Sequence, residues 1–332
     1  MSSPVLTNAK VLVTGGAGFI GSNLCEDLLK HNNKVRCMDN LATGKVQNID
    51  ALMENPDFEF LRTDIRNMDD CHKAMKGVDL VFHQAALGSV PRSIKDPQST
   101  HEVNVNGFLN VLIAARNAGV KRFIYASSSS VYGDSPDLPK VEEHIGKPLS
   151  PYAVSKTCNE LYANVFHKVY GMETIGLRYF NVFGKHQDPE GAYAAAIPKF
   201  IKSLIQHESP MINGDGTHSR DFTYIKNVIG MNHLAASTNS VEAFGHVFNT
   251  AVGERFDLNR MLQLIKTNLA EYDAEVTGIE VKHGPERQGD IPHSLASIEK
   301  AKRILQYSPE YDFEKGLREC ISWYWESLSA TQ

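Results

Sequence analysis

The chain has 332 residues, and its 34 lysines and arginines against 39 aspartates and glutamates give a net charge of −5, which excludes a strongly basic protein that follows nucleic-acid phosphates. Hydrophobic residues make up 42% of the chain and charged residues 22%, so the composition excludes disorder and allows one large domain or two ordinary ones. Because no segment approaches the roughly 18 to 20 apolar residues of a membrane helix and residues 1–7 do not resemble a signal peptide, we expect a cytoplasmic protein without a nucleic-acid or membrane partner.

Short β-branched apolar segments alternate with longer amphipathic segments over the first half of the chain, which is the pattern of βαβ units. The predicted strands are Lys10–Thr14, Lys34–Asp39, Asp57–Leu61, Leu80–His83, Arg122–Ser127 and Thr174–Arg178. The predicted helices are Ile20–Lys30, Asp69–Met75, Thr100–Ala118 and Tyr152–Val169. The pattern predicts an α/β fold with a Rossmann-type, doubly wound parallel sheet.

The alternation weakens after about residue 180, where loop signals cluster, as in the Asn-Gly-Asp-Gly turn at Asn213–Gly216. We therefore predict a nucleotide-binding domain over residues 1–180 and a smaller, less regular substrate-binding domain over residues 181–332. The chain is expected to return to the first domain around residues 221–251.

The cysteines are Cys25, Cys37, Cys71, Cys158 and Cys320. They are odd in number, widely spread and never spaced as CxxC, which disfavours both a disulfide framework and a zinc site. We expect reduced cysteines that pack in the core, and no metal site.

Glycines follow the first predicted strand at the GxxGxxG spacing of Gly15, Gly18 and Gly21, a variant of the dinucleotide fingerprint. Such glycines permit a tight turn and let the backbone approach a pyrophosphate at a helix N-terminus. Asp39 ends the second predicted strand, where a carboxylate can accept hydrogen bonds from ribose hydroxyls and repel a 2′-phosphate, which favours NAD over NADP. The alternative is that Asp39 caps a turn. Asp64 could reach the adenine ring or cap a turn.

Tyr152 and Lys156 lie four residues apart on a predicted helix and therefore share one face. A lysine ammonium stabilises a nearby phenolate, so we expect Lys156 to lower the pKa of Tyr152 toward neutrality and make it a general base. The serine segment that begins at Ser127 follows a predicted strand and could place hydroxyls at the same end of the sheet. For Ser127 and Ser130, a polar loop whose hydroxyls bond to one another is an equal alternative.

These motifs together resemble the extended short-chain dehydrogenase/reductase family, and within it the nucleotide-sugar 4-epimerases. The resemblance rests on the glycine triplet, Asp39, the serine segment ending in Val131-Tyr132-Gly133, Tyr152-x-x-x-Lys156 and Arg178-Tyr179-Phe180-Asn181-Val182. Gln84–Ser93 and Ser150–Ala153 narrow it to a branch that is similar to the UDP-N-acetylglucosamine 4-epimerases of surface-polysaccharide pathways.

The resemblance implies three catalytic residues, Ser128, Tyr152 and Lys156. Tyr152 would take the proton of the sugar 4-hydroxyl while C4 gives a hydride to NAD, and the 4-keto sugar would then turn over and take the hydride back on its other face. Lys156 would hold the nicotinamide ribose, and Ser128, helped by Ser129, would hydrogen-bond the 4-oxygen. NAD would stay bound because the net redox change is zero.

The resemblance also implies two sets of binding residues. NAD would contact Gly15, Gly18, Phe19, Ile20, Gly21, Asp39, Asn40, Asp64, Ile65, Ala85, Tyr152, Lys156 and Tyr179. The UDP-sugar would contact Ser89, Ser128, Ser129, Tyr152, Asn181, Arg220, Arg287, Asp290 and Ser294. Arg220 and Arg287 would grip the diphosphate with forked guanidinium groups, and Asp290 would bind the uridine ribose.

Ser294 stands where epimerases restricted to unsubstituted sugars carry a bulky aromatic residue, so the resemblance implies room for an N-acetyl group. The alternative is that neighbouring side chains fill that space. A UDP-glucose 4-epimerase, a UDP-uronic acid 4-epimerase or decarboxylase, and a non-catalytic NAD-binding regulator remain open. A 4,6-dehydratase is disfavoured because Ser129 and Ser130 replace its Asp and Glu. The helices Thr100–Ala118 and Tyr152–Val169 resemble those of a family dimer interface, which implies a homodimer, although their apolar residues could equally pack internally.

Overall fold

The computed structural model describes residues 4–191, 194–285 and 292–329. Within them, seven parallel strands form a sheet in the order β11-β6-β5-β4-β1-β2-β3. The strands are β1 Lys10–Thr14, β2 Lys34–Asp39, β3 Phe58–Arg62, β4 Leu80–His83, β5 Arg122–Ser128, β6 Glu173–Tyr179 and β11 His246–Thr250. The strand order reverses between β1 and β4, which creates a crevice at the carboxyl ends of these strands. The predicted Rossmann-type α/β fold is confirmed.

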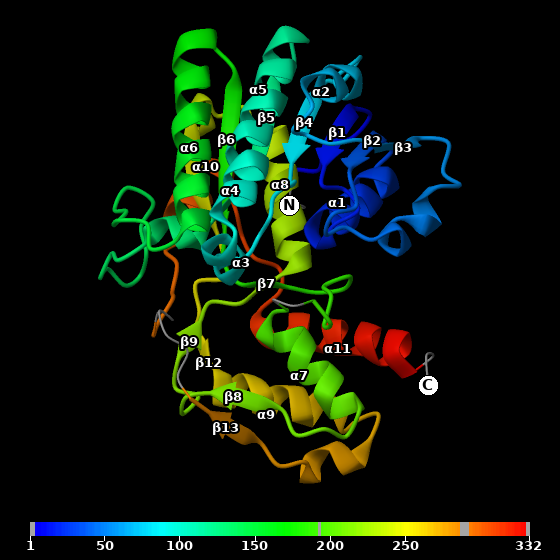
Figure 1. Ribbon diagram of the computed structural model, residues 1–332, viewed down its shortest axis with the longest axis vertical. Helices are drawn as coiled ribbons and strands as arrows, with labels where there is room; N and C mark the ends of the chain where they lie inside the picture. Colours follow the sequence, from blue (N-terminus) through cyan, green and yellow to red (C-terminus); the bar gives the residue numbers. More distant parts are fainter. Residues whose placement is uncertain (1–3, 192–193, 286–291, 330–332) are drawn as a thin grey trace.

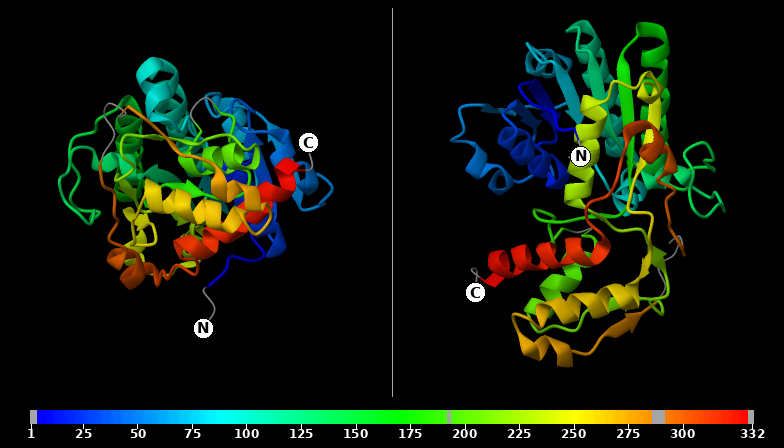
Figure 2. Two further views of the ribbon diagram at one scale, coloured as in Figure 1. Left: turned by 90° about the horizontal axis from the view of Figure 1, so that it is seen from below. Right: turned by 180° about the vertical axis from the view of Figure 1, so that it is seen from behind.

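Helices cover both faces of this sheet (Figures 1 and 2). Val11 and Val13 of β1 pack with α1 and α8 on one face, whereas Leu12 packs with α2, α5 and α6 on the other. Burial on both faces explains why the central strands are nearly continuous apolar runs. The helices of this part are α1 Phe19–Lys30, α2 Met68–Ala74, α3 Val90–Lys95, α4 Pro97–His101, α5 Phe108–Asn117, α6 Pro151–Tyr170 and α8 Ile225–Ser237. We call this part the sheet lobe.

The remaining elements form a second, less regular lobe below the sheet lobe in Figure 1. It contains α7 Ala196–Ile205, α9 Leu258–Leu269, α11 Phe313–Ser329 and the paired short strands β8 Met211–Asn213 with β13 Lys282–Gly284 and β9 Ser219–Arg220 with β12 Phe256–Asp257. The strands β7 Val182–Phe183 and β10 Thr223–Tyr224 pair where the chain passes between the lobes. The helix α10 Glu299–Leu305 contacts β11 of the sheet lobe.

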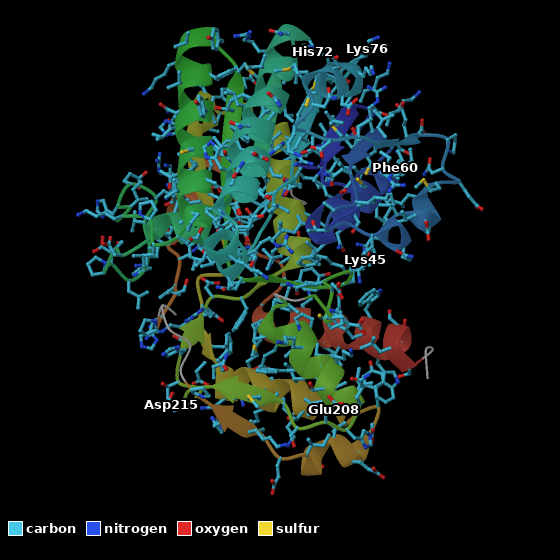
Figure 3. The ribbon with its side chains drawn as sticks, viewed as in Figure 1. Lys45, Phe60, His72, Lys76, Glu208 and Asp215 are labelled. Carbon is cyan, nitrogen blue, oxygen red and sulfur yellow. The ribbon has the colours of Figure 1, made fainter. Side chains whose placement is uncertain are left out.

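Side chains also join the lobes across their boundary. Lys45, labelled in Figure 3, lies on the sheet lobe above the second lobe and pairs with Asp188 at 2.8 Å. Lys185, in the same loop as Asp188, pairs with Glu26 of α1 at 2.5 Å. These contacts hold the loop after β7 against the sheet lobe.

One predicted helix is interrupted. Instead of a single helix over 100–118, the chain forms α4, a π-helical turn over Glu102–Gly107, and α5. The turn buries Asn104, whose side chain accepts a hydrogen bond from the Leu87 amide at 2.7 Å and donates to the Leu87 carbonyl at 3.2 Å. A wider turn at this place agrees with the tendency of such turns to occur near functional sites.

No helix of the described ranges is both long and apolar enough to cross a membrane. All five cysteines are free; Cys158 is partly exposed and the other four are buried.

Candidate active site

The first turn of the sheet lobe can be built only from glycines at two of its positions. Gly15 has φ +69°, and a Cβ there would lie 2.7 Å from the Cα of Ala85. A Cβ on Gly21 would lie 2.1 Å from the carbonyl oxygen of Gly15. The missing side chains leave the N-terminus of α1 open toward the crevice, which is the arrangement that suits a pyrophosphate.

A cavity of about 300 Å³ lies directly at this turn. Nine of the predicted NAD residues line it: Gly15, Gly18, Phe19, Ile20, Gly21, Asp39, Asn40, Ile65 and Ala85. Ala42, Thr43, Thr63, Leu87, Gly88 and Val103 also line it and were not predicted. The cavity sits at the carboxyl ends of parallel strands, where ligands of such sheets bind.

Asp39 caps a turn, which is one of the two alternatives suggested by its sequence position, and it also lines the cavity. Its carboxylate oxygens accept hydrogen bonds from the amides of Ala17, at 3.0 Å, and Leu41, at 2.8 Å. Its side chain also lines the cavity, and burial raises its pKa. Because each carboxylate oxygen can accept two hydrogen bonds, the turn contacts leave acceptor capacity for a ribose.

Asp64 does not line the cavity. It pairs with Arg66 at 2.7 Å and accepts a hydrogen bond from Asn40 at 2.8 Å, and the Arg66 side chain lowers its pKa to about 2. The amide of Arg66 also donates to it, at 2.8 Å. The bonds of Asp64 are therefore those of the turn-capping alternative, and its link to the cavity runs through Asn40.

Ser128, Tyr152 and Lys156 come together at the carboxyl end of β5. Ser150 caps α6 through a hydrogen bond from the amide of Ala153 at 3.1 Å, which places Tyr152 in the first helical turn. The Tyr152 phenol lies near Ser128, whose side chain acts to lower the pKa of the phenol. Lys156 is buried one turn further on, with Nζ 5.9 Å from the Tyr152 ring centroid. Ser129 follows Ser128 in a short helical turn over Ser129–Tyr132.

One expectation about this trio is wrong. The pKa of Tyr152 is raised and not lowered, because burial raises it and the Ser128 side chain offsets this only in part. The Lys156 ammonium instead donates to the carbonyl oxygen of Ala126 at 2.9 Å, and burial lowers its pKa to about 8. Helical spacing predicted the shared face, but the backbone carbonyl that binds the ammonium comes from β5.

The two neighbouring serines have different surroundings. Ser127 donates a hydrogen bond to Glu160 at 2.5 Å, so it belongs to a buried network and not to a loop of mutually bonded serines. The Ser130 hydroxyl is buried and has no hydrogen-bond partner among the described residues.

Tyr179 reaches the cavity through another side chain. Its hydroxyl donates to Gln84 at 3.2 Å and accepts from Asn232 at 2.9 Å, while burial raises its pKa to about 12. Gln84 lines the cavity, whereas Tyr179 itself does not. The chain therefore supports the cavity wall here with a closed set of three hydrogen bonds, since Gln84 also donates to Asn232 at 3.3 Å.

The predicted substrate residues lie in three places. Ser89 caps α3 by accepting a hydrogen bond from the Arg92 amide at 3.1 Å. Asn181, directly after β6, donates to the carbonyl oxygen of Asp221 at 2.9 Å. Arg220 and Ser294 meet in the second lobe, because Arg220 donates to the Ser219 carbonyl at 3.0 Å and the Ser294 amide donates to the same oxygen at 3.0 Å. Arg287 and Asp290 lie outside the described residues.

Two residues near these positions were not predicted. Asp221 is fully buried and accepts backbone hydrogen bonds from Val252 at 3.1 Å, Gly253 at 3.0 Å and Ala296 at 3.3 Å, and burial raises its pKa to about 6. It therefore ties the segment of Ser294 to the end of β11. Asn104 joins the cavity wall to α6 by donating to Ser155 at 3.1 Å. The place of Asn104 in a π-helical turn has no simple sequence signal. Asp221 could have been found from the sequence, because it directly follows the predicted Arg220.

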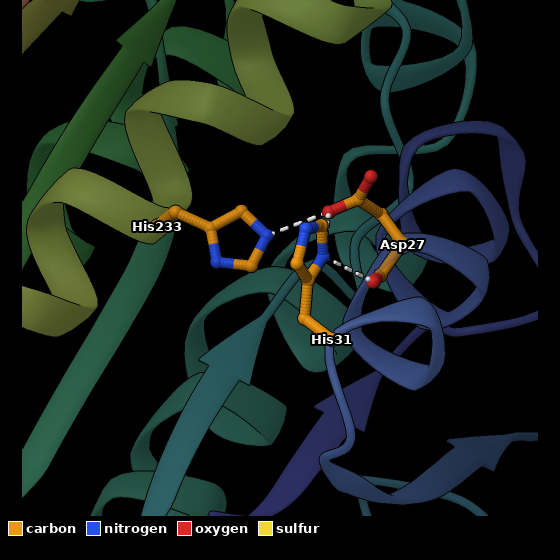
Figure 4. Close-up of side chains that lie close together, drawn as sticks. All are labelled: Asp27, His31 and His233. Atoms are coloured by element: carbon orange, nitrogen blue, oxygen red, sulfur yellow. Dashed lines mark hydrogen bonds and ion pairs between the residues drawn. The ribbon is translucent and has the colours of Figure 1, made fainter. Parts of the chain in front are cut away.

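A second group of polar side chains lies on the α1–α8 side of the sheet (Figure 4). Asp27 accepts a hydrogen bond from His233 Nε2 at 2.7 Å, and His31 Nδ1 lies 3.3 Å from the same carboxylate. These are the three side chains of the described residues close enough together to hold a metal ion. However, the Leu6 amide donates to His233 Nδ1 at 3.2 Å, so the ring proton sits on Nε2 and no lone pair there faces a metal.

The same side of the molecule has a cavity of about 530 Å³, larger than the one at the glycine turn. It is lined by residues of α1, α8 and α11 and by none of the predicted site residues. The glycine turn, the strand ends and the residues Ser128, Tyr152 and Lys156 all lie at the smaller cavity or beside it. We therefore place the active site there.

Comparisons with known proteins show the family of the chain. Residues 11–251 match the model of the NAD dependent epimerase/dehydratase family. UDP-N-acetylglucosamine 4-epimerase from Methanobrevibacter ruminantium M1, solved in complex with UDP-N-acetylmuramic acid, is 40% identical with a TM-score of 0.90, over 97% of this chain and 100% of that one. UDP-glucuronic acid 4-epimerase from Bacillus cereus, solved with UDP-glucuronic acid and NAD, is 33% identical with a TM-score of 0.86, over 96% of this chain and 98% of that one.

A UDP-glucose 4-epimerase of Mycolicibacterium smegmatis is 31% identical over 325 residues, which cover 95% of this chain and 98% of that protein. The resemblance inferred from the motifs is confirmed, as is the use of NAD. The chain belongs to the NAD-dependent epimerase/dehydratase family, within the extended short-chain dehydrogenases/reductases, and is an NAD-dependent enzyme related to the UDP-sugar 4-epimerases.

Proposed function

We propose that the chain is a UDP-sugar 4-epimerase that interconverts UDP-N-acetylglucosamine and UDP-N-acetylgalactosamine through a transient 4-keto sugar. The observation that carries this proposal is the meeting of Ser128, Tyr152 and Lys156 at the carboxyl end of β5, on the sheet edge that holds the glycine-turn cavity. A protein that only binds NAD needs neither a phenol nor a hydroxyl in that place. The Ser129–Ser130 pair also lacks the acid and base that a dehydration would use.

The residues of the site divide the chemistry as follows. Tyr152 takes the proton of the sugar 4-hydroxyl, and Ser128 holds the 4-oxygen by a hydrogen bond while the carbonyl forms. Bound NAD supplies a hydride acceptor and donor at C4. Lys156, with a pKa of about 8, is largely charged at neutral pH and would hold the nicotinamide ribose beside Tyr152. The Tyr152 proton returns to the 4-oxygen when the hydride returns on the opposite face.

The preference for an N-acetylated sugar is supported by Ser294. It is a small residue beside the Arg220 segment, and a tyrosine in its place would fill volume next to the sugar. The Methanobrevibacter UDP-N-acetylglucosamine 4-epimerase supports the same choice by its 40% identity. Arg220 of this segment, together with Arg287, is proposed to bind the diphosphate, and Asp290 the uridine ribose.

Incubation with three nucleotide sugars tests the proposal. UDP-N-acetylglucosamine, UDP-glucose and UDP-glucuronic acid are each followed by proton NMR for inversion at C4. We expect the fastest inversion with UDP-N-acetylglucosamine. Faster inversion of the uronic acid would move the assignment to the UDP-uronic acid epimerases, and no inversion with any of the three would reject the proposed function.

The proposed division of labour gives the NAD site to residues 1–180 with the return at 221–251, and the UDP-sugar site to residues 181–332. The strand β11 and the helix α8 within 221–251 pack in the sheet lobe, which supports that return. The free cysteines support a reducing compartment, and we propose the cytoplasm.

We also propose that two copies associate through α6. Six large side chains on this helix are 39 to 64% exposed: Val154, Leu161, Tyr162, Val165, Val169 and Tyr170. Rows of exposed apolar residues at helical spacing mark interaction surfaces. Light scattering on a size-exclusion column should report a dimer for the natural chain and a monomer for Leu161→Arg. A natural chain that elutes as a monomer would reject this association.

A further inference from the structure

Two arginine–glutamate pairs lie near opposite ends of the neighbouring strands β5 and β6. The first joins β5 to β6, and the second joins β6 to α6. Near the amino ends, Arg122 pairs with Glu173 at 2.7 Å, and these side chains are 10% and 17% exposed. Near the carboxyl ends, Arg178 pairs with Glu160 at 2.8 Å, and these are 3% and 10% exposed. In the second pair, Glu160 lies on α6 with Tyr152 and Lys156, and Arg178 is paired in the strand register with Ser127, next to Ser128.

Glu160 lies on the α6 face of the proposed catalytic residues, one helical turn after Lys156 and two after Tyr152. Its Oε1 accepts hydrogen bonds from the Ser127 hydroxyl at 2.5 Å and from Arg178 Nε at 2.9 Å. Arg178 Nη2 donates to Oε2 at 2.8 Å. Ser127 precedes Ser128 and is paired with Arg178 in the strand register, so one carboxylate fixes α6 to the end of β5 and to β6.

Arg178 extends the same network to the segment that connects β5 with α6. Its Nη1 donates to the carbonyl oxygen of Glu142 at 2.9 Å, and its guanidinium lies 4.8 Å from the ring centroid of Tyr132. Tyr132 ends the turn that carries Ser129, and its hydroxyl donates to Asn249 at 2.7 Å. The pair therefore joins every segment that carries a proposed catalytic side chain.

Glu160 also acts on Lys156 by its charge. Burial lowers the pKa of Lys156, and attraction to Glu160 opposes that effect. Tyr152 on α6 and His83 on β4 also face Lys156, whereas Tyr125 on β5 and Arg178 on β6 interact with Glu160. Burial keeps His83 neutral, with a pKa lowered to about 3, and burial keeps Tyr125 neutral by raising its pKa. Loss of the Glu160 charge would leave the effect of burial on the pKa of Lys156 unopposed.

We propose that Glu160 is a positioning residue for the epimerisation, which fixes Ser128 against Tyr152 through Ser127 and Arg178 and holds its carboxylate one helical turn from Lys156. This inference rests on the proposed function, because it concerns the same trio. Glu160 touches neither the cavity nor the reacting atoms. Glu160 acts on the distance between the end of β5 and the start of α6, and on the charge of Lys156.

The test compares Glu160→Gln with Glu173→Gln, which breaks the matched pair at the far end of the same strands. For Glu160→Gln we expect kcat to fall about 100-fold with KM within about twofold, because small displacements of reacting groups have effects of that size. The alkaline limb of the kcat profile should move to lower pH by about one unit, since Lys156 loses its attracting carboxylate. Glu173→Gln should leave both kcat and the profile unchanged.

A second variant covers the case in which Glu160→Gln fails to fold. Buried ion pairs can often be replaced by apolar residues without loss of stability, so the double variant Glu160→Leu, Arg178→Met should fold. If the pair acts only on stability, this variant regains wild-type kcat. If it positions the trio, the folded double variant remains at least about 10-fold slower than wild type and keeps the shifted profile.

A direct titration separates this inference from the proposed function. The Lys156 signal in protein labelled with ¹³C at lysine Cε, identified by its loss in Lys156→Arg, should titrate at lower pH in Glu160→Gln than in wild type and at the wild-type pH in Glu173→Gln. An unmoved midpoint in Glu160→Gln, or equal changes in both variants, would overturn the role of Glu160 whether or not the enzyme inverts a sugar. An inactive wild type would reject the proposed function alone.

Discussion

The two lobes place their proposed functional residues in different ways. In the sheet lobe, Gly15, Asp39, Ser128 and Tyr152 all stand at the ends of strands or in the first turn of a helix, on a repeated βαβ framework. In the second lobe, Arg220 belongs to a two-residue strand, and Ser294 is held by a single bond from its backbone to Ser219. The difference suggests that the regular lobe determines the rate of the chemistry and the irregular lobe determines which sugar enters.

The largest expected effect is in the sheet lobe. Tyr152→Phe removes the hydroxyl that exchanges the proton with the sugar and should lower kcat by about 10³ to 10⁴-fold, the usual contribution of a positioned acid–base group. The melting temperature and the NAD content should stay near wild type. Tyr162→Phe, on the exposed face of the same helix, is the matched control and should keep full activity. A Tyr152→Phe enzyme with wild-type kcat would show that the sheet lobe does not supply the proposed acid–base group.

The second expected effect concerns NAD. Gly15→Ala places a methyl group against the Ala85 backbone in a turn of φ +69°, and should weaken NAD binding by about 100-fold or more. Gly77 has the same φ of +69° but open space around it, so Gly77→Ala carries the backbone strain without the contact. Fluorescence titration with NADH should show weakened binding in the first variant alone. Equal losses in both would mean that strain, and not the close approach of Ala85, decides the affinity.

The third prediction moves to the second lobe. Ser294→Tyr should lower kcat/KM for UDP-N-acetylglucosamine relative to UDP-glucose by about 10- to 200-fold, the range that steric exclusion from a pocket gives. Ser294→Ala keeps the space and should keep the ratio. If Ser294→Tyr leaves the ratio of the two kcat/KM values unchanged, the choice between the two sugars does not depend on the space beside this residue. That result would argue against the second lobe as the part that selects the sugar.

The smallest expected effect concerns stability. Asp221 joins the lobes, and burial raises its pKa to about 6. The folded state keeps the proton up to about pH 6, whereas the unfolded state releases it near pH 4, so this group's contribution to stability falls as pH rises between these values. The change in free energy of unfolding should be on the order of 1 kcal/mol, or a few degrees in Tm.

The matched variant for that measurement is Asp221→Asn, which does not titrate. The difference in Tm between wild type and Asp221→Asn should shift in favour of the variant as pH rises from about 4 to about 6. A difference that is constant over this range would show that Asp221 has the same pKa in the folded and the unfolded protein.

Much of the sheet lobe could be predicted from the sequence because periodicity and motif spacing act locally. Strand ends, the glycine turn and the shared face of Tyr152 and Lys156 follow from such local patterns. What failed depends on contacts between distant segments: the bond of Lys156 to Ala126, the π-helical turn around Asn104, and the raised pKa of Tyr152. The roles of Glu160 and Asp221 depend likewise on partners far along the chain, so spacing alone could not reveal them.

The central claim is that C4 loses its hydride to the bound cofactor and regains the same hydride on the other face. UDP-N-acetylglucosamine deuterated at C4 tests this in ordinary water, with the product examined by NMR and mass spectrometry. The account predicts inverted UDP-N-acetylgalactosamine that retains deuterium at C4. Inverted product with protium at C4 would contradict it, because the hydrogen would then have come from solvent and not from the cofactor.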